Sequence, residues 1–294
     1  MQISATLHAM PELPEVETVR RGLLPVLEGR QIVRAEVRRT GLRIPFPDDL
    51  GPWLTGRRVQ SIKRRAKYML MAFDGTDDVL VIHLGMSGRM VVIGVGGANR
   101  AQEPGTHDHV VIDTDGGTRI FFNDARRFGL ITRVPAASLD FHPLFARLGP
   151  EPLADDFNGA VLSQSLKGRV TSIKAALLDQ RTVAGLGNIY VCEVLNRAGI
   201  SPKRKAANIS TGRAHRLAAV IKDVLVEAIA AGGSSLRDHV LPSGELGYFQ
   251  HKFSVYGREG DSCPGCDCDT LESGGIRKIV QGGRSTFYCP RHQH

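Results

Sequence analysis

Residues 10–18, Met-Pro-Glu-Leu-Pro-Glu-Val-Glu-Thr, decide how the rest of the chain is interpreted. The second half of this stretch predicts the start of a helix. Pro14 suits the first helical position, where its missing N–H is no loss, and the glutamates beside it are favoured by the helix dipole. Apolar residues then recur at helical spacing, although Pro25 is expected to end or kink the helix. Pro11 and Glu12 remain as a short lead-in.

The lead-in has a chemical interpretation and a structural one. If translation starts at Met10 and this methionine is removed, Pro11 exposes a free secondary amine. Such an amine can attack an aldehyde-like carbon and form an iminium, as lysine does in Schiff-base chemistry. The carboxyl group of Glu12 beside it can move protons. The alternative is a purely structural Pro-Glu lead-in, and this short fragment by itself favours that alternative.

Length, composition and charge limit the classes of protein to which the chain can belong. Its 294 residues allow two domains, and a hydrophobic content of 42% is that of a folded globular protein. Because no apolar run can span a membrane and residues 1–9 lack the pattern of a signal peptide, we expect a cytoplasmic protein. The net charge of +8 favours a polyanionic partner, although many plain enzymes are basic too.

Short segments rich in β-branched and aromatic residues, separated by turn residues, follow the first helix. We expect strands at 31–38, 59–63, 68–73, 79–84, 89–93, 109–114, 119–122 and 129–134. This pattern predicts a β-sandwich or barrel. A proline-bearing linker and a helical region follow, with helices at 188–198 and along an apolar stripe that ends at Gly232-Gly233. Near the C-terminus, two short strands flank a glycine turn at 282–283, which indicates a hairpin.

Four cysteines and one histidine near the C-terminus indicate a metal site. Cys263-x2-Cys266 is a chelating pair, and Cys289-x2-His292 is a second pair beyond the hairpin. Two such pairs that close on one ion give a tetrahedral Cys3His site, which suits one structural zinc ion per chain. A finger this small cannot bury enough apolar surface to fold without metal. Cys268 is an alternative second ligand, although the two-residue gap favours Cys266.

The opening MPELPEVETVRRGL strongly resembles the start of the formamidopyrimidine-DNA glycosylases, the bacterial Fpg or MutM enzymes. Further stretches resemble the family in the same order along residues 10 to about 292: RRAKYML, HLGMSG, HDH, DARRFG, LGPEPL, GLGNIY, GYF, VYGR and GRSTFYC. The chain departs from the family in three places. Residues 1–9 precede the usual start, His292 stands where the family has a fourth cysteine, and the segment between the two chelating pairs is longer than usual.

The resemblance implies a two-domain α+β fold. Its parts would be an N-terminal β-sandwich flanked by helices and a C-terminal helical domain with a helix–two-turns–helix motif and a β-hairpin zinc finger. The expected boundaries are 1–9 for an extension that is disordered or not translated, 10–134 for the catalytic sandwich, 135–152 for the linker, 153–250 for the helical domain and 251–294 for the finger.

The resemblance also implies a function. The chain would be a monomeric, nucleoid-associated DNA glycosylase and AP lyase of base-excision repair that removes oxidised purines, notably 8-oxoguanine and formamidopyrimidines, from duplex DNA. Pro11 would attack C1′ of the flipped nucleoside, Glu12 would move protons, and β,δ-elimination would leave a one-nucleoside gap. Lys67 and Arg284 would contact phosphates and assist elimination. The residues by themselves also fit two solvated surface cations. A guanidinium beside a hairpin tip, such as that of Arg284, is in addition well suited to bind a phosphate with two nitrogens.

An enzyme that acts on a base inside a duplex must extrude that base and fill the void that it leaves. The family assigns this task to a trio that here corresponds to Met86, Arg126 and Phe128. Further DNA contacts implied by the resemblance are His107, Arg169, Lys174 and Asn188. The residues by themselves leave other roles open, because Met86 also suits loop packing and Asn188 also suits a helix N-cap.

Two rival functions remain. An endonuclease VIII-like glycosylase for oxidised pyrimidines shares the Pro-Glu start and the finger. The loop 234–249 with Gly247-Tyr248-Phe249, together with the void-filling trio, favours the purine-specific branch instead. A lesion-binding protein without catalysis is the second rival, because retained residues 1–9 make the Pro11 nitrogen a tertiary amide. A misplaced start codon explains these nine residues more simply.

Overall fold

The computed structural model describes residues 10–94, 102–234, 247–267 and 269–294. Residues 1–9, most of the predicted loop 234–249 and Cys268 lie outside the described residues. The chain forms two compact units. The first comprises Met1–Ala146 and Ala231–Tyr248, and the second comprises Arg147–Ala230 and Phe249–His294. Within the described part of the chain, the helices are too short or too polar to cross a membrane.

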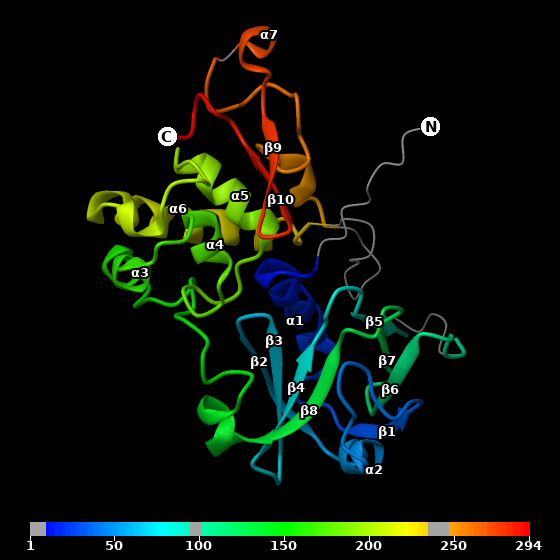
Figure 1. Cartoon of the computed structure of the whole chain (residues 1–294). Coiled ribbons are helices and arrows are strands. Elements are labelled where there is room, and N and C mark those ends of the chain that lie inside the picture. The colour runs from blue at the N-terminus through cyan, green and yellow to red at the C-terminus, as the bar shows by residue number, and fades with distance from the viewer. Residues whose placement is uncertain (1–9, 95–101, 235–246, 268) are drawn as a thin grey trace. The chain divides into compact units, whose positions relative to one another are not determined.

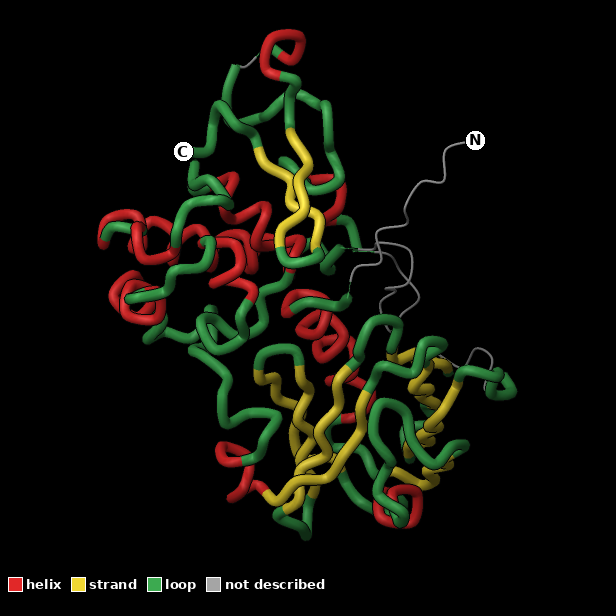
Figure 2. The backbone as a smooth tube through the Cα atoms, in the orientation of Figure 1, coloured by secondary structure: helices red, strands yellow, loops and turns green. Residues whose placement is uncertain are grey.

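The first unit is a sandwich of two antiparallel four-stranded sheets (Figures 1 and 2). One sheet has the order β1 (Ile32–Val37), β6 (Asp108–Thr114), β7 (Arg119–Asn123) and β5 (Arg89–Ile93). The other has the order β2 (Val59–Arg65), β3 (Tyr68–Phe73), β4 (Asp78–His83) and β8 (Leu130–Pro135). All eight predicted strands are confirmed, with their ends within two residues of the predicted ones. Apolar side chains from both sheets and from the first helix form one core.

Helix α1 (Leu13–Leu27) begins directly after the Pro-Glu lead-in. A capping box fixes its start: the backbone N–H of Glu12 donates to Glu15 Oε2 at 2.9 Å. Pro14 therefore occupies the second helical position and not the first. Pro25 was expected to end or kink the helix. It does not end it, because α1 continues to Leu27 and a proline in the last turn removes only one hydrogen bond. The apolar stripe of α1 is buried in the sandwich core.

Short helices complete the first unit. Helix α2 (Leu50–Leu54) packs beside β1, and the 3-10 helix η2 (Ala136–Phe141) occupies part of the expected linker. The segment 231–248 also groups with this unit, whereas the sequence placed it in the helical domain. One contact that joins this segment to the first unit is made by Ser234, which donates two hydrogen bonds to the buried carboxylate of Glu15.

The second unit is helical and ends in a two-stranded hairpin. Its helices are α3 (Gly159–Leu166), α4 (Ile173–Leu178), α5 (Asn188–Arg197), η3 (Ala206–Asn208), α6 (Thr211–Ala230), η4 (Phe249–Lys252) and α7 (Thr270–Ser273). Strands β9 (Arg277–Gln281) and β10 (Arg284–Tyr288) form the predicted hairpin. Its two turn residues, Gly282 and Gly283, have positive φ angles of 55° and 71°, which a tight hairpin turn of this type requires.

Candidate active site and DNA-binding residues

The predicted nucleophile lies at the start of α1. Pro11 is buried, and Glu12 is only 3% exposed. Glu15 fixes this lead-in, because Oε2 of its carboxylate accepts the N–H of Glu12 while Oε1 accepts the backbone N–H and the hydroxyl of Ser234 at 2.8 and 2.9 Å. The sequence assigned Glu15 only to the helix dipole. Its spacing of three residues from Glu12 was the available signal, since this is the spacing of a capping box.

Lys67 lies in the two-residue turn between β2 and β3, directly before the strand that begins at Tyr68. Although it is a turn residue, it is only 7% exposed. Ala66 before it has a φ of 53°, a conformation that costs a residue with a Cβ about 1 kcal/mol. The turn therefore holds a nearly buried ammonium group on a strained backbone.

His83 lies close to this turn and was missed by the sequence analysis. The centre of its ring lies 4.7 Å from that of Tyr68, with the two rings tilted by 50°, and its Nδ1 accepts the N–H of Gly85 at 2.9 Å. Burial, followed by the charges of Lys67 and Arg43, lowers the pKa of His83 to about 4. His83 is therefore neutral at pH 7, which allows it to lie beside Lys67 without repulsion between two cations.

Two loops bring the predicted void-filling trio onto the first unit. Met86 follows β4 and is half-buried, whereas Arg126 and Phe128 precede β8 and are exposed. The guanidinium of Arg126 lies 5.3 Å from the centre of the Phe128 ring. His107 is also exposed, and its carbonyl accepts the N–H of Asp124, which precedes the second loop. The first unit thus carries all four residues on neighbouring segments.

A buried carboxylate ties these two loops together. Asp124 is fully buried and accepts the hydroxyl of Ser87, which in turn accepts the N–H of Arg126 at 3.0 Å. Gly85 allows the loops to meet, because a Cβ at this position would lie 2.4 Å from the carbonyl carbon of Phe128. Neither Asp124 nor Ser87 was singled out from the sequence. Both lie inside stretches that resembled the family, so the motif itself was the available signal.

Lys174 does not have the surroundings that were expected of it. It was expected to contact phosphate, but it is fully buried in the second unit. Its ammonium group donates to the carbonyl of Ser285 at 3.0 Å and to the hydroxyl of Thr286 at 2.6 Å. Helix α4 therefore directs this cation to the backbone of β10, where it is shielded from a polyanion outside the protein.

Asn188 reaches the same carbonyl from α5. Its Nδ2 donates to Ser285 O at 2.9 Å. The alternative role as a helix N-cap is wrong, because Gly187 occupies the cap and Asn188 is the first helical residue. Arg284 pairs with Gln281 in the hairpin and is exposed, and its guanidinium has no hydrogen bond or ion pair to the part of the chain that the structure describes. Two side chains thus hold the backbone beside an accessible guanidinium.

Arg169 is half-buried, and its Nη1 donates to Asp179 at 2.9 Å. A hydrogen bond from Arg181, followed by weaker contributions that include Arg169, lowers the pKa of Asp179 to about 2. The carboxylate is therefore charged at any pH at which DNA is bound, and it orients Arg169.

Glu193, which the sequence analysis also missed, is buried and accepts the backbone N–H groups of residues 254–256 at 2.7–3.1 Å. It anchors the chain that leads into the finger.

The cysteines fit a structural zinc ion. The sulfur atoms of Cys263, Cys266 and Cys289 all lie within 4.8 Å of one another. Backbone N–H groups of Gly265 and His292 point at two of these sulfurs, each at 3.4 Å, and such donors favour the thiolate form that binds metal. The ring of His292 is not in this group, since its Nε2 lies 3.0 Å from the carbonyl of Asn196. Bound there, the ion would cross-link the finger and would take no part in the chemistry.

Comparison with known proteins places the chain in a family. Residues 10–131 match the formamidopyrimidine-DNA glycosylase N-terminal domain, and residues 148–240 match the formamidopyrimidine-DNA glycosylase H2TH domain. The formamidopyrimidine-DNA glycosylase of Rhodospirillum centenum is 57% identical over 293 residues, which cover 97% of this chain and 100% of that protein. The chain therefore belongs to the formamidopyrimidine-DNA glycosylase family.

Solved structures agree with this assignment. The MutM (Fpg) protein of Thermus thermophilus is 38% identical, with a TM-score of 0.82 over 96% of this chain and 98% of that one. A mutant Fpg of Lactococcus lactis in complex with DNA that contains Fapy-dG is 35% identical. Its TM-score is 0.85 over 97% of this chain and 100% of that one. The predicted family and fold class are thus confirmed.

Proposed function

We propose that the protein is a DNA glycosylase and AP lyase of base-excision repair that removes oxidised purines from duplex DNA. One observation carries this proposal: the match to the family extends over both units, including the Pro-Glu start and the helix–two-turns–helix segment. The Lactococcus lactis relatives were solved with DNA that contains Fapy-dG and with DNA that contains an abasic site. These are the substrate and the intermediate that a bifunctional enzyme handles in turn.

The proposed reaction begins at the Pro11 nitrogen. This amine bonds to C1′ of the flipped nucleoside while the bond between C1′ and the damaged base breaks, and Glu12 transfers protons in this step. The C1′–O4′ bond then breaks, O4′ takes up a proton and the nitrogen becomes an iminium. The iminium makes the C2′ proton acidic, so its removal expels the 3′ phosphate by β-elimination. The 5′ phosphate then leaves by δ-elimination. Lys67 and Arg284 are proposed to stabilise the charge of these two phosphates.

The same proposal covers the remaining properties of the protein. Cys263, Cys266 and Cys289 would hold one zinc ion per chain, and His292 would complete the site when its ring leaves the carbonyl of Asn196. The enzyme would act as a monomer on chromosomal DNA in the bacterial cytoplasm, where its net charge of +8 favours association with DNA. No residue that is proposed to act on the substrate depends on a soluble cofactor.

Side-by-side excision assays test the choice of lesion. Duplexes with 8-oxoguanine and duplexes with an oxidised pyrimidine are incubated under identical conditions with protein that begins at Pro11. We expect faster release of the purine lesion. Faster release of the pyrimidine lesion would replace the proposal by the endonuclease VIII-like alternative. Binding to both duplexes without release or strand cleavage would identify a lesion-binding protein.

Arg126→Ala is expected to reduce excision from duplex DNA by about tenfold to a hundredfold, because the void left by the flipped base loses its guanidinium. Cleavage of an abasic site in single-stranded DNA should change little, since a single strand has no orphaned base. The measurement compares single-turnover rates on the two substrates. Arg34→Ala, which removes an exposed arginine that pairs with Glu36, is the control. Equal losses on both substrates would contradict the role of Arg126.

Arg284→Ala is expected to weaken binding to any DNA sequence and to flatten the salt dependence of the affinity by about one unit of slope, because one phosphate contact is lost. Binding is measured at several salt concentrations. Arg291→Ala is the matched control, since Arg291 is an exposed cation of the same finger that pairs with Glu272. An unchanged slope for Arg284→Ala would remove this residue from the phosphate-binding set.

A further inference from the structure

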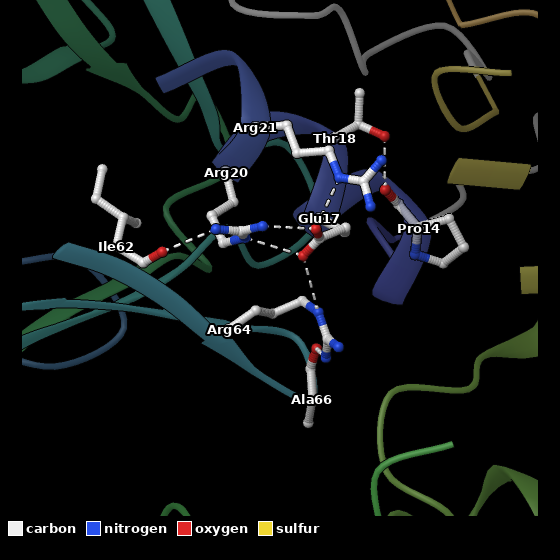
Figure 3. A network of polar contacts seen from close by, with 8 residues as sticks. All are labelled: Pro14, Glu17, Thr18, Arg20, Arg21, Ile62, Arg64 and Ala66. Carbon is white, nitrogen blue, oxygen red and sulfur yellow. Dashed lines mark hydrogen bonds and ion pairs between the residues drawn. The ribbon is translucent and has the colours of Figure 1, made fainter. Parts of the chain in front are cut away.

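The carboxylate of Glu17, on the second turn of α1, collects three guanidinium groups (Figure 3). Arg20 binds it with two nitrogens at 2.8 and 3.0 Å. Arg21 and Arg64 each donate one hydrogen bond, at 2.8 and 3.3 Å. Burial by itself would raise the pKa of Glu17, but the hydrogen bonds from Arg20 and Arg21 outweigh it, so the pKa lies below its ordinary value. The carboxylate is therefore charged at neutral pH, and it accepts hydrogen bonds from all three arginines.

The three arginines differ in what else they contact. Arg20 also donates to the carbonyl of Ile62 in β2 at 2.9 Å. Arg64 is itself a residue of β2, and its side chain is only 10% exposed. Arg21 has a side chain that is 59% exposed, and its hydrogen bond goes to Glu17. Two of the three guanidiniums thus join α1 to β2, whereas Arg21 adds charge alone.

Arg64 extends the network into the turn that carries Lys67. Its Nη1 donates to the carbonyl of Ala66 at 2.8 Å (Figure 3). This is the residue with the unfavourable φ of 53°, so the hydrogen bond acts on the strained peptide that directly precedes Lys67. A continuous chain of contacts therefore runs from α1 through Glu17 and Arg64 to the backbone of Lys67.

The two ends of this chain are the two groups to which the proposed reaction assigns chemistry. Pro11 lies two residues before α1, and the start of α1 is fixed by its capping box. Lys67 lies immediately after Ala66. We propose that Glu17 and Arg64 are positioning residues that set the place of the Lys67 ammonium group relative to the Pro11 nitrogen. This inference rests on the proposed function and adds two residues to it that do not touch the substrate.

The matched pair Arg64→Met and Arg21→Met tests the inference. Each variant removes one guanidinium from Glu17, but only the first releases the carbonyl of Ala66. Cleavage of a preformed abasic site, the step assigned to Lys67, should slow about tenfold to a hundredfold in Arg64→Met and remain unchanged in Arg21→Met. Equal rates for the two variants would overturn the inference, as would an equal loss in both.

A spectroscopic measurement separates positioning from general stability. Burial is the largest cause of the lowered pKa of His83, and the charges of Lys67 and Arg43 lower it further. If the ammonium group moves away in Arg64→Met, the pKa of His83 should rise in an NMR titration, whereas in Arg21→Met it should stay near 4. An unchanged His83 titration in Arg64→Met would show that Lys67 has not moved and would overturn the inference.

Two further variants keep the test conclusive. One is used if Arg64→Met does not fold, and the other separates failure of this inference from failure of the proposed function. Arg64→Lys keeps the charge beside Glu17 but cannot bind both Glu17 and Ala66 in the same way, so it should slow cleavage even where Arg64→Met fails to fold. Lys67→Met tests the proposed role of Lys67 itself. Wild-type cleavage by Lys67→Met would refute that role. Impaired cleavage by Lys67→Met combined with wild-type cleavage by Arg64→Lys would refute the inference alone.

Discussion

Protein that begins at Pro11 is expected to be trapped covalently on 8-oxoguanine DNA by borohydride, whereas the 294-residue chain should bind the same DNA without an adduct. The reason is the state of the Pro11 nitrogen. A ring amine with one hydrogen can attack C1′ and give a cationic iminium, which borohydride reduces. An amide nitrogen has its lone pair delocalised into the carbonyl and cannot attack. The measurement is gel analysis of the adduct, with the attached residue mapped by mass spectrometry.

The comparison needs proof that the longer chain remains intact. Its mass is therefore determined after the reaction, because removal of residues 1–10 during the assay would create the active terminus. Pro11→Gly keeps a primary amine and should retain partial trapping. Glu12→Gln should slow base release more than cleavage of a preformed abasic site. Efficient trapping of the intact 294-residue chain would refute Pro11 as the nucleophile, and Lys67 would be the first group to examine.

Loss of a zinc ligand is expected to abolish DNA binding while the β-sandwich stays folded. We expect one zinc ion per chain in freshly purified protein and none in Cys263→Ala or Cys289→Ala. Metal binding supplies on the order of 10 kcal/mol to the folding of small zinc sites, which is more than a finger of this size gains from its own core. Without the finger, Arg284 and the backbone that Lys174 and Asn188 hold lose their places.

The chain contains a built-in probe for this experiment. Trp53 is its single tryptophan and packs edge-to-face on Phe73 within the sandwich, at 5.2 Å between ring centres. Unfolding followed by Trp53 fluorescence should therefore be the same for the cysteine variants and the wild type. Cys268→Ala should impair zinc binding and DNA binding less than Cys266→Ala does. The reverse order would reassign the second ligand to Cys268. Purified wild-type protein without zinc would contradict the proposed metal site.

Local patterns in the sequence were sufficient for most of the architecture. Short segments rich in β-branched and aromatic residues between turn residues located the eight strands, and the apolar stripe at helical spacing located α6. Two consecutive glycines predicted the hairpin turn, and the two-residue gap in Cys263-x2-Cys266 predicted that these two cysteines come together. These features depend on neighbours a few residues apart, so the sequence alone contains the information that determines them.

The partners of the buried polar groups were decided by the tertiary structure alone. Lys174 had the appearance of a phosphate-binding cation, but its ammonium group is bound to Thr286, 112 positions further along the chain. Glu15 finds Ser234 at a separation of 219 positions, and Glu17 finds Arg64 at 47. A charged side chain follows no periodic rule that names its partner, because the partner depends on which segments the folded core brings together. The sequence therefore predicted which residues carry the chemistry, and the tertiary structure determined which residues hold them in place.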